Sequence, residues 1–305
     1  MPTTAPDLIR VVAAALIDGQ GRVLLAQRPR HTHQGGLWEF PGGKIEAGET
    51  AAVALRRELQ EEIGVTPLRA RPLKAVTHDY GDRRVHLDVW RVDAWEGQVV
   101  GREGQAIQWV TMHELVDQAM PAADRPICQA LRLPEQIAIV SDPTPAQLLR
   151  IPASVALLLR VPQLSATAYA DRLQRLRQDW PQRAWYAHDR VDLVQPLQLA
   201  GVHASSRVWQ HWQERPRLSC WCGASAHDAA DLKRAHELGL DYATLSPVLP
   251  TNSHVGQPAL GWDRFAALCA GTSLCVYALG GVGPADLARA WQQGGQGVAG
   301  ISAYQ

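Results

Sequence analysis

The stretch GKIEAGETAAVALRRELQEEIGV, residues 43–65, places glycines and carboxylates at fixed intervals. Gly43 is followed by Glu49, and Gly64 lies close to the end of the stretch. Residues 50–63 contain no Gly or Pro and are rich in Ala, Leu, Glu and Arg, which predicts a helix. Because glycine lets the backbone come close to a ligand, we expect a glycine loop that leads into this helix and a Gly64 that ends it.

Three carboxylates gather on one side of the predicted helix. Glu58, Glu61 and Glu62 are spaced i, i+3 and i+4, so they crowd one arc of its surface. Like charges at that spacing destabilise a bare helix. A bound divalent cation makes the same cluster stabilising, because Mg²⁺ prefers carboxylate oxygens as ligands. The alternative is a solvated acidic face. The flanking glycines and Arg57 favour the metal site.

The same residues resemble the signature of the Nudix hydrolases at every fixed position from Gly43 to Val65. That signature is G-x5-E-x7-R-E-U-x-E-E-x-G-U, where U is aliphatic. The resemblance implies a metal-dependent hydrolase of nucleoside diphosphate linkages, with Mg²⁺ or Mn²⁺ as cofactor. The residues implied to hold the metal or to act in catalysis are Gly42, Arg57, Glu58, Glu61 and Glu62.

Over residues 8–132 the chain resembles the MutT-type branch of that family, the 8-oxo-dGTP diphosphatases. LWEFPGGKIE at 37–46, YGDR at 80–83 and REGQ at 102–105 carry this resemblance. It implies hydrolysis of 8-oxo-dGTP-type triphosphates to monophosphate and pyrophosphate, which removes oxidised nucleotides before DNA replication. Glu103 is implied to join the metal or to act as general base. The residues implied to contact the nucleotide are Arg28, Phe40, Asp82, Arg83 and Asp124.

Asp124 departs from the MutT-type pattern, which has an asparagine there. An Asn amide donates and accepts hydrogen bonds, whereas an ionised Asp only accepts. An ionised Asp124 could accept from the N1–H and N2–H₂ of guanine, but it would lose any contact in which Asn donates. The alternative for Asp124 is a helix N-cap before Arg125.

Two further nucleotide contacts also have plain structural alternatives. Phe40 is one of only two phenylalanines and could stack on a base or fill the core. Arg28 lies in Gln27-Arg28-Pro29-Arg30 and could contact the nucleotide or stay in a solvated basic loop.

The hydrophobic pattern changes near Leu133-Pro134. Residues 1–132 show an α+β mixture, with an expected hairpin from 10–17 and 23–26 and a strand at 85–92. We expect this domain to be the Nudix α/β/α sandwich. In residues 136–305, eight short apolar runs alternate with helical stretches, which predicts a compact (β/α)8 TIM barrel and an α/β chain of two domains. The eight runs are 137–140, 155–159, 184–187, 200–203, 218–222, 242–245, 275–279 and 298–301.

The second half resembles thiamine-phosphate synthase and its TenI-like relatives. The segments that carry the resemblance are 139–142, 189–193, 201–203, 279–282 and 297–302. TIM barrels often bind phosphate at the ends of strands seven and eight, which makes Gly280, Gly281 and Ser302 the candidate phosphate site. The alternative is a tight turn without a ligand.

The synthase chemistry is incomplete in this chain. Of the Gln-x-Arg-x-Lys pattern expected on the second strand, only Arg160 is present. Asp189 fits one Mg²⁺ ligand, but the second expected aspartate is missing from 204–208, and His254 replaces an expected lysine. We therefore expect a degenerate barrel that makes no thiamine phosphate. It would bind a phosphorylated small molecule, or serve as a non-catalytic sensor or interaction module.

The composition of the chain bears on its binding partners and its location in the cell. The chain has 305 residues, with 30 Lys+Arg and 30 Asp+Glu, which argues against nucleic-acid or membrane partners. Five cysteines are an odd number without a disulfide framework, and the N-terminus lacks the features of a signal peptide, so we expect a cytoplasmic protein. An alternative function is cleavage of a thiamine-related diphosphate that the barrel recognises.

Overall fold

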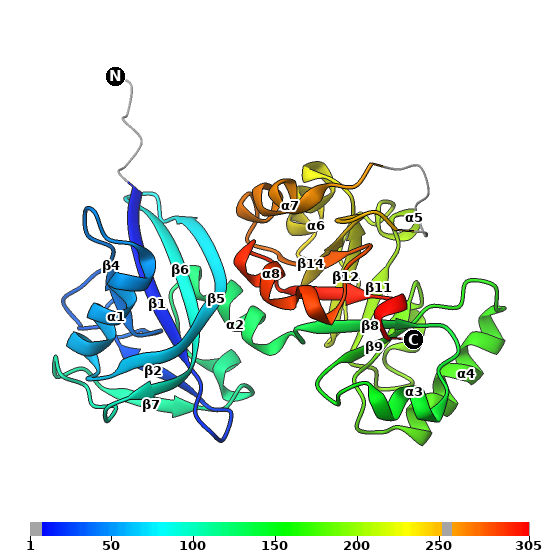
Figure 1. Cartoon of the computed structure of the whole chain (residues 1–305), viewed down its shortest axis with the longest axis horizontal. Coiled ribbons are helices and arrows are strands. Elements are labelled where there is room, and N and C mark those ends of the chain that lie inside the picture. Colours follow the sequence, from blue (N-terminus) through cyan, green and yellow to red (C-terminus); the bar gives the residue numbers. More distant parts are fainter. Residues whose placement is uncertain (1–7, 252–257, 305) are drawn as a thin grey trace. The chain divides into compact units, whose positions relative to one another are not determined.

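The computed structural model describes residues 8–251 and 258–304, so His254 lies outside the described residues. The chain divides into two compact units, Met1–Leu133 and Pro134–Gln305 (Figure 1). Among the described helices, none is both long and apolar enough to cross a membrane.

The first unit contains two sheets and two α-helices. The four-stranded sheet has the order β4 (Gly42–Lys44), β1 (Leu8–Leu16), β6 (Arg84–Glu96) and β5 (Thr66–Asp79), and β1 pairs in parallel with β6. The three-stranded sheet is antiparallel, with the order β3 (Trp38–Glu39), β2 (Val23–Gln27) and β7 (Ile107–Val110). The helices are α1 (Ala51–Glu62) and α2 (Arg125–Arg132), preceded by 3-10 turns at Glu114–Asp117 and Ala122–Asp124.

Helix α1 forms where the sequence predicts it and packs on β1. Thr50 caps its N-terminus, since its hydroxyl accepts the N–H of Val53 at 3.3 Å. Gly64 ends the helix with a left-handed φ of 76°, which suits glycine. The apolar side of α1, including Leu55 and Leu59, belongs to one buried cluster with residues of β1. This packing fixes which side of α1 faces the solvent.

The expected hairpin is wrong in its pairing. Strands β1 and β2 lie in different sheets and meet only at the single bridge Ile17–Val23. Both edges of β1 are taken by β4 and β6, so β2 pairs elsewhere. The long strand β5 was not predicted. Its prolines and bulges interrupt the alternating pattern that marks a strand.

The second unit is a closed barrel of eight parallel strands, which confirms the predicted fold. The strands are β8 (Gln136–Val140), β9 (Ala156–Leu159), β10 (Trp185–His188), β11 (Gly201–Ala204), β12 (Trp221–Ala226), β13 (Tyr242–Leu245), β14 (Cys275–Leu279) and β15 (Gly297–Gly300). The helices are α3 (Pro145–Arg150), α4 (Ala166–Asp179), α5 (Ser206–Trp209), α6 (Ala229–Glu237), α7 (Gly261–Ala270) and α8 (Leu287–Gln292). Only β12 is displaced from its predicted range, 218–222.

Buried tyrosines fill part of the barrel interior. Tyr186, Tyr242 and Tyr277 are almost completely buried, and Tyr242 contacts the other two edge to face. Gly201 and Gly223 leave room for these rings, since an added Cβ would lie 2.4 Å from Tyr186 and 2.1 Å from Tyr242. The barrel is therefore filled by side chains where these three tyrosines lie.

Candidate active site

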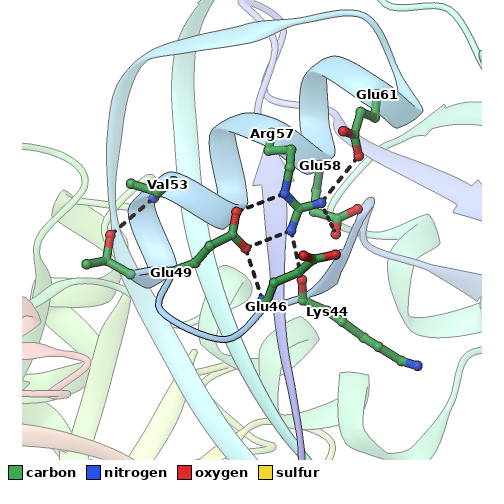
Figure 2. Close-up of polar contacts among 8 residues, drawn as sticks. Lys44, Glu46, Glu49, Val53, Arg57, Glu58 and Glu61 are labelled. Atoms are coloured by element: carbon green, nitrogen blue, oxygen red, sulfur yellow. Dashed lines mark hydrogen bonds and ion pairs between the residues drawn. The ribbon is translucent and has the colours of Figure 1, made fainter.

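Arg57 joins the glycine loop to helix α1 (Figure 2). Its guanidinium donates to both carboxylate oxygens of Glu49, at 2.9 and 2.8 Å, and to the carbonyl of Lys44 at 3.0 Å. The other side of the same group contacts Glu58 at 2.7 Å and Glu61 at 3.3 Å. The hydrogen bonds from Arg57 lower the pKa of Glu49 to about 2, and those with Glu49 and Glu58 raise the pKa of Arg57. Arg57 thus positions the carboxylates.

The glycine loop lies directly against the first of the helix carboxylates. A Cβ on Gly43 would lie 2.3 Å from a carboxylate oxygen of Glu58, so a larger residue would push that side chain away. Gly42 has a φ of 152°, and a Cβ there would lie 2.2 Å from the carbonyl oxygen of Val12. The backbone therefore requires glycine at Gly42, and glycine at Gly43 leaves the Glu58 carboxylate in its place beside the loop.

Glu62 is a half-buried member of the carboxylate set, and it contacts the glycine loop. One of its oxygens accepts the N–H of Gly42 at 2.7 Å. Burial raises the pKa of Glu62 to about 7, against the opposing effect of the Gly42 hydrogen bond and with help from the charges of Glu39 and Glu103. A bound cation would stabilise the ionised form of this half-buried carboxyl, because its charged neighbours are negative.

Glu103 is held near Glu62 by its own loop. The side chain of Gln105 donates to the carbonyl of Glu62 at 3.0 Å and accepts the N–H of Glu103 at 2.9 Å. Arg102 adds a hydrogen bond from its N–H to the carbonyl of Glu62 at 2.9 Å. Within residues 8–251 and 258–304, the exposed carboxylate of Glu103 makes no hydrogen bond or ion pair. It is therefore free to act on a ligand or a water.

The predicted metal ligands fit a hard cation in their chemistry. Glu58, Glu61, Glu62 and the carbonyl of Gly42 all offer oxygen, which Mg²⁺ and Mn²⁺ prefer. In the described part of the chain, no three His, Cys, Asp or Glu side chains converge in a metal-binding arrangement. Two of the carboxylates contact Arg57 instead, so they would have to turn from it to bind a metal.

Asp124 is buried and unpartnered in the described structure. It is 4% exposed, and its carboxyl makes no hydrogen bond or ion pair with any described residue. Asp124 occupies the N-cap position of α2, as the helix-cap alternative expects, but its side chain forms no capping hydrogen bond. Burial, reinforced by the charge of Glu39 and opposed by that of Arg28, raises the pKa of Asp124 to about 8. The raised pKa favours the neutral form of Asp124 near pH 7, in place of the ionised form expected from the sequence.

Arg28 and Glu39 form an ion pair next to Asp124. Arg28 also donates to the carbonyl of His33 at 2.9 Å, so it is not part of a free solvated loop. Burial raises the pKa of Glu39, and the charge of Arg28 opposes that shift. Arg28 therefore pairs directly with the half-buried Glu39 and acts on the buried Asp124 only through its charge.

Glu39 and Tyr80 lie near Asp124 but are not among the predicted site residues, although both stand in the segments 37–46 and 80–83. The Tyr80 hydroxyl accepts the N–H of Ala123 at 3.3 Å, and burial raises the pKa of Tyr80. The signal that could have found Glu39 is a charged residue between two aromatic residues, Trp38 and Phe40.

The other predicted nucleotide contacts differ in exposure. Phe40 is 2% exposed, so its ring is packed in the described fold, as the core alternative states. Asp82 and Arg83 are solvent-exposed and pair with each other at 3.0 Å. His33 lies 3.8 Å from Asp82 and contacts the ring of Tyr80, so these loops lie close to Arg28.

The predicted phosphate site of the barrel has the geometry of a tight turn. Gly280 and Gly281 have left-handed φ values of 88° and 70°. Side chains there would collide with Pro247 and with the carbonyl of Pro250, at 2.9 and 2.6 Å. Ser302 follows β15 and is exposed. The turn accounts for both glycines, and phosphate binding stays a prediction.

Comparison with known proteins finds a matching family for each half of the chain. Residues 12–130 match the family described as NUDIX domain, and residues 149–304 match the family described as thiamine monophosphate synthase. The CTP pyrophosphohydrolase of Escherichia coli K12 is 38% identical over 119 residues, which cover 39% of this chain and 88% of that protein. An 8-oxo-dGTP diphosphatase of Proteus vulgaris is 42% identical over 96 residues, or 32% of this chain and 86% of that protein. The 8-oxo-dGTP diphosphatase of Escherichia coli K12 is 33% identical over 124 residues, or 41% of this chain and 96% of that protein.

Proposed function

This chain belongs to the Nudix family through residues 12–130 and to the thiamine monophosphate synthase family through residues 149–304, and from that premise we propose that it hydrolyses 8-oxo-dGTP-type nucleoside triphosphates to monophosphate and pyrophosphate. The enzyme is a Nudix pyrophosphohydrolase. One observation carries the proposal most: the glycine loop meets α1 where Gly42 contacts Glu62 and Gly43 lies against Glu58.

The catalytic roles follow from the contacts of each side chain. Gly42, Glu58, Glu61 and Glu62 would hold Mg²⁺ or Mn²⁺, which neutralises phosphate charge and polarises the phosphate under attack. Arg57 positions Glu58 and Glu61 through ion pairs with both carboxylates. Glu103, which has no partner among the described side chains, takes a proton from the attacking water. The water oxygen bonds to phosphorus, and pyrophosphate leaves.

A neutral Asp124 offers one donor and one acceptor, as an asparagine amide does. The major-groove edge of guanine presents two acceptors, N7 and O6. In 8-oxoguanine N7 carries a hydrogen, so the same edge presents a donor beside the O6 acceptor. A neutral Asp124 can satisfy both groups of the oxidised base but only one of the normal base. This pattern supports the oxidised nucleotide as substrate.

Cytosine is a second candidate base on the same grounds. Its N4–H₂ group is a donor and its N3 is an acceptor, so a neutral carboxyl could also pair with it. The resemblance to the CTP pyrophosphohydrolase of Escherichia coli adds to that case. A thiamine-related diphosphate has no comparable support. The barrel would bind a phosphorylated small molecule at Gly280, Gly281 and Ser302, or act as a sensor without catalysis.

A substrate panel tests this proposal. The specificity constant kcat/KM would be measured with Mg²⁺ for 8-oxo-dGTP, dGTP, CTP, ADP-ribose and thiamine diphosphate. We expect kcat/KM for 8-oxo-dGTP to exceed that for dGTP by about 5- to 150-fold, since one mismatched hydrogen bond costs about 1–3 kcal/mol. Equal constants for 8-oxo-dGTP and dGTP would remove the base assignment, and a preference for ADP-ribose or thiamine diphosphate would remove the substrate class.

A further inference from the structure

A serine and a histidine meet at the carboxyl ends of two consecutive barrel strands. Ser206 begins α5, just after β11, and His227 directly follows β12. The Oγ of Ser206 lies 3.1 Å from the Nε2 of His227. In barrels of this type, active sites are built from the loops at the carboxyl ends of the strands. The pair of Ser206 and His227 therefore lies on the face that a substrate would approach.

The other ring nitrogen of His227 fixes the direction of this hydrogen bond. The Nδ1 of His227 lies 3.0 Å from the carbonyl oxygen of Ser246, which directly follows β13. Because a carbonyl oxygen only accepts, Nδ1 carries the ring hydrogen, and the Nε2 of the neutral ring keeps its lone pair. The hydroxyl of Ser206 therefore donates to Nε2. A serine that donates its hydrogen to an oriented imidazole has the arrangement of an activated nucleophile.

The backbone on both sides of the pair is anchored. The N–H of His227 donates to a carboxylate oxygen of Asp231 at 2.9 Å. Trp209, which is completely buried, donates its indole N–H to the carbonyl of Ser225 at 2.8 Å and so ties α5 to β12. Ser206 and His227 are therefore brought together by two fixed segments of the barrel.

Burial does not account for the contact between Ser206 and His227. Ser206 is half-buried and His227 is exposed, so water could satisfy both groups without this hydrogen bond. The carbonyl of Ser225 is a second acceptor for the Ser206 hydroxyl, but at the longer distance of 3.4 Å. By contrast, the pair of His203 and Ser225, at 3.0 Å, is closed to a substrate, because His203 is 3% exposed. Ser206 and His227 are thus the accessible serine–histidine pair of this face.

We propose that Ser206 and His227 act as nucleophile and general base in the hydrolysis of a small carboxylic ester at the carboxyl end of the barrel. The Oγ of Ser206 bonds to the ester carbonyl carbon, and its proton passes to Nε2 of His227. His227 gives that proton to the alcohol as the carbon–oxygen bond breaks.

The second half of the reaction restores both side chains. Water attacks the carbonyl carbon of the acyl-serine, and His227 takes a proton from that water. The proton returns to the Oγ of Ser206 as the carboxylic acid leaves, so each ester consumes one water. The carbonyl of Ser246 holds His227 in the tautomer that both steps need.

This activity is independent of the other two reactions considered for the chain. It uses no residue of the glycine loop or of α1, which serve the hydrolase domain. It also uses neither Arg160 nor Asp189, the residues that remain of the synthase pattern. A barrel that has lost synthase chemistry can therefore keep this reaction.

Treatment of the full chain with diisopropyl fluorophosphate tests the nucleophile. A bond forms between Oγ and phosphorus, fluoride leaves, and the serine proton passes to the base. We expect one adduct per chain, located on Ser206 by mass spectrometry of peptides. Ser206→Ala should abolish the adduct, and His227→Gln should slow labelling by roughly 100-fold or more, because a general base contributes about 10²–10⁴-fold. The matched control Ser273→Ala should label like the wild type, since Ser273 contacts His236 at 3.4 Å before the amino end of β14.

Hydrolysis of p-nitrophenyl acetate tests the substrate class. We expect an acetyl group on Ser206 after quenching in acid, and turnover that Glu62→Gln retains and Ser206→Ala loses. Hydrolysis at equal rates by the wild type and by Ser206→Ala would overturn the proposed reaction. Labelling of the wild type that misses Ser206, or that reaches Ser206 and Ser273 equally, would overturn the proposed nucleophile, and this result does not depend on the folding of any variant.

Discussion

Replacement of Asp124 by asparagine is the sharpest test of how the hydrolase domain reads its base. The pKa of Asp124 is about 8, so about nine in ten molecules carry a neutral carboxyl at pH 7 and about one in ten at pH 9. If the neutral form binds the base, kcat/KM for 8-oxo-dGTP falls about tenfold for each pH unit above 8. Asp124→Asn presents the same donor and acceptor at every pH.

The expected results follow from those protonation states. Asp124→Asn should retain kcat/KM within about threefold at pH 7 and should lose the alkaline decrease. Asp124→Ala removes two neutral hydrogen bonds of about 1 kcal/mol each, which corresponds to about 30-fold at pH 7. Steady-state kinetics from pH 6.5 to 9.5 with saturating Mg²⁺ would give these values.

A second variant checks the cause of the raised pKa. Glu39→Gln removes a negative neighbour, so the pKa of Asp124 should fall and the alkaline decrease should begin at lower pH. Tyr80 and Cys128 also face Asp124, but burial raises the pKa of Tyr80 from its ordinary value of 10.0 and that of Cys128 to about 12, above the pH range used. If Asp124→Asn is as impaired as Asp124→Ala, or keeps the alkaline decrease, the neutral-acid account is refuted.

Other predictions concern the metal, the domains, the barrel and stability. Glu62→Gln should lower Mg²⁺-dependent turnover by roughly 100-fold or more, and near-normal turnover with the same metal response would contradict the site. A chain that ends at Leu133 should fold and hydrolyse nucleotides, because the first unit has its own buried cluster, and loss of all soluble protein would contradict this. A coupled assay with both synthase substrates should detect no thiamine phosphate, because Arg160 alone remains of the expected Gln-x-Arg-x-Lys pattern. Thiamine phosphate formed at the same rate by the wild type and by Glu62→Gln would refute the prediction of a degenerate barrel. Since the pKa of Asp124 is raised from 3.8 to about 8, its stabilising contribution is complete below pH 3.8 and is lost as pH rises to about 8. Asp124→Asn should therefore stabilise the domain by at most about 4 kcal/mol at pH 7 and by little at pH 4, and an equal gain at both, measured by urea unfolding, would contradict the shift.

The local features of the fold could be predicted because they depend on nearby residues. Helix α1 follows from the composition of 50–63, the Thr50 cap and the glycine after it. The barrel strands follow from short apolar runs at regular intervals, because parallel strands are buried on both faces. Strand pairing in the first unit could not be predicted, since it depends on which sheet edge remains free for β2.

The parts of the candidate site that could be predicted are those whose residues all lie on one helix. Glu58, Glu61 and Glu62 share one helix, so their spacing alone predicts that they lie on the same side of it. The surroundings of Asp124 arise from three separate segments that supply Arg28, Glu39 and Asp124. Burial and a neighbouring charge together change the protonation of Asp124, and neither is visible in the local sequence.

The products formed from 8-oxo-dGTP test the central claim most directly. Phosphorus NMR would follow the full chain with 8-oxo-dGTP and Mg²⁺, with Glu62→Gln as the inactive variant and the exposed barrel change Lys233→Gln as the active control. The account predicts 8-oxo-dGMP and pyrophosphate in equal amounts from the wild type and from Lys233→Gln, and almost none from Glu62→Gln. Release of orthophosphate in place of pyrophosphate, or equal turnover by Glu62→Gln, would contradict it.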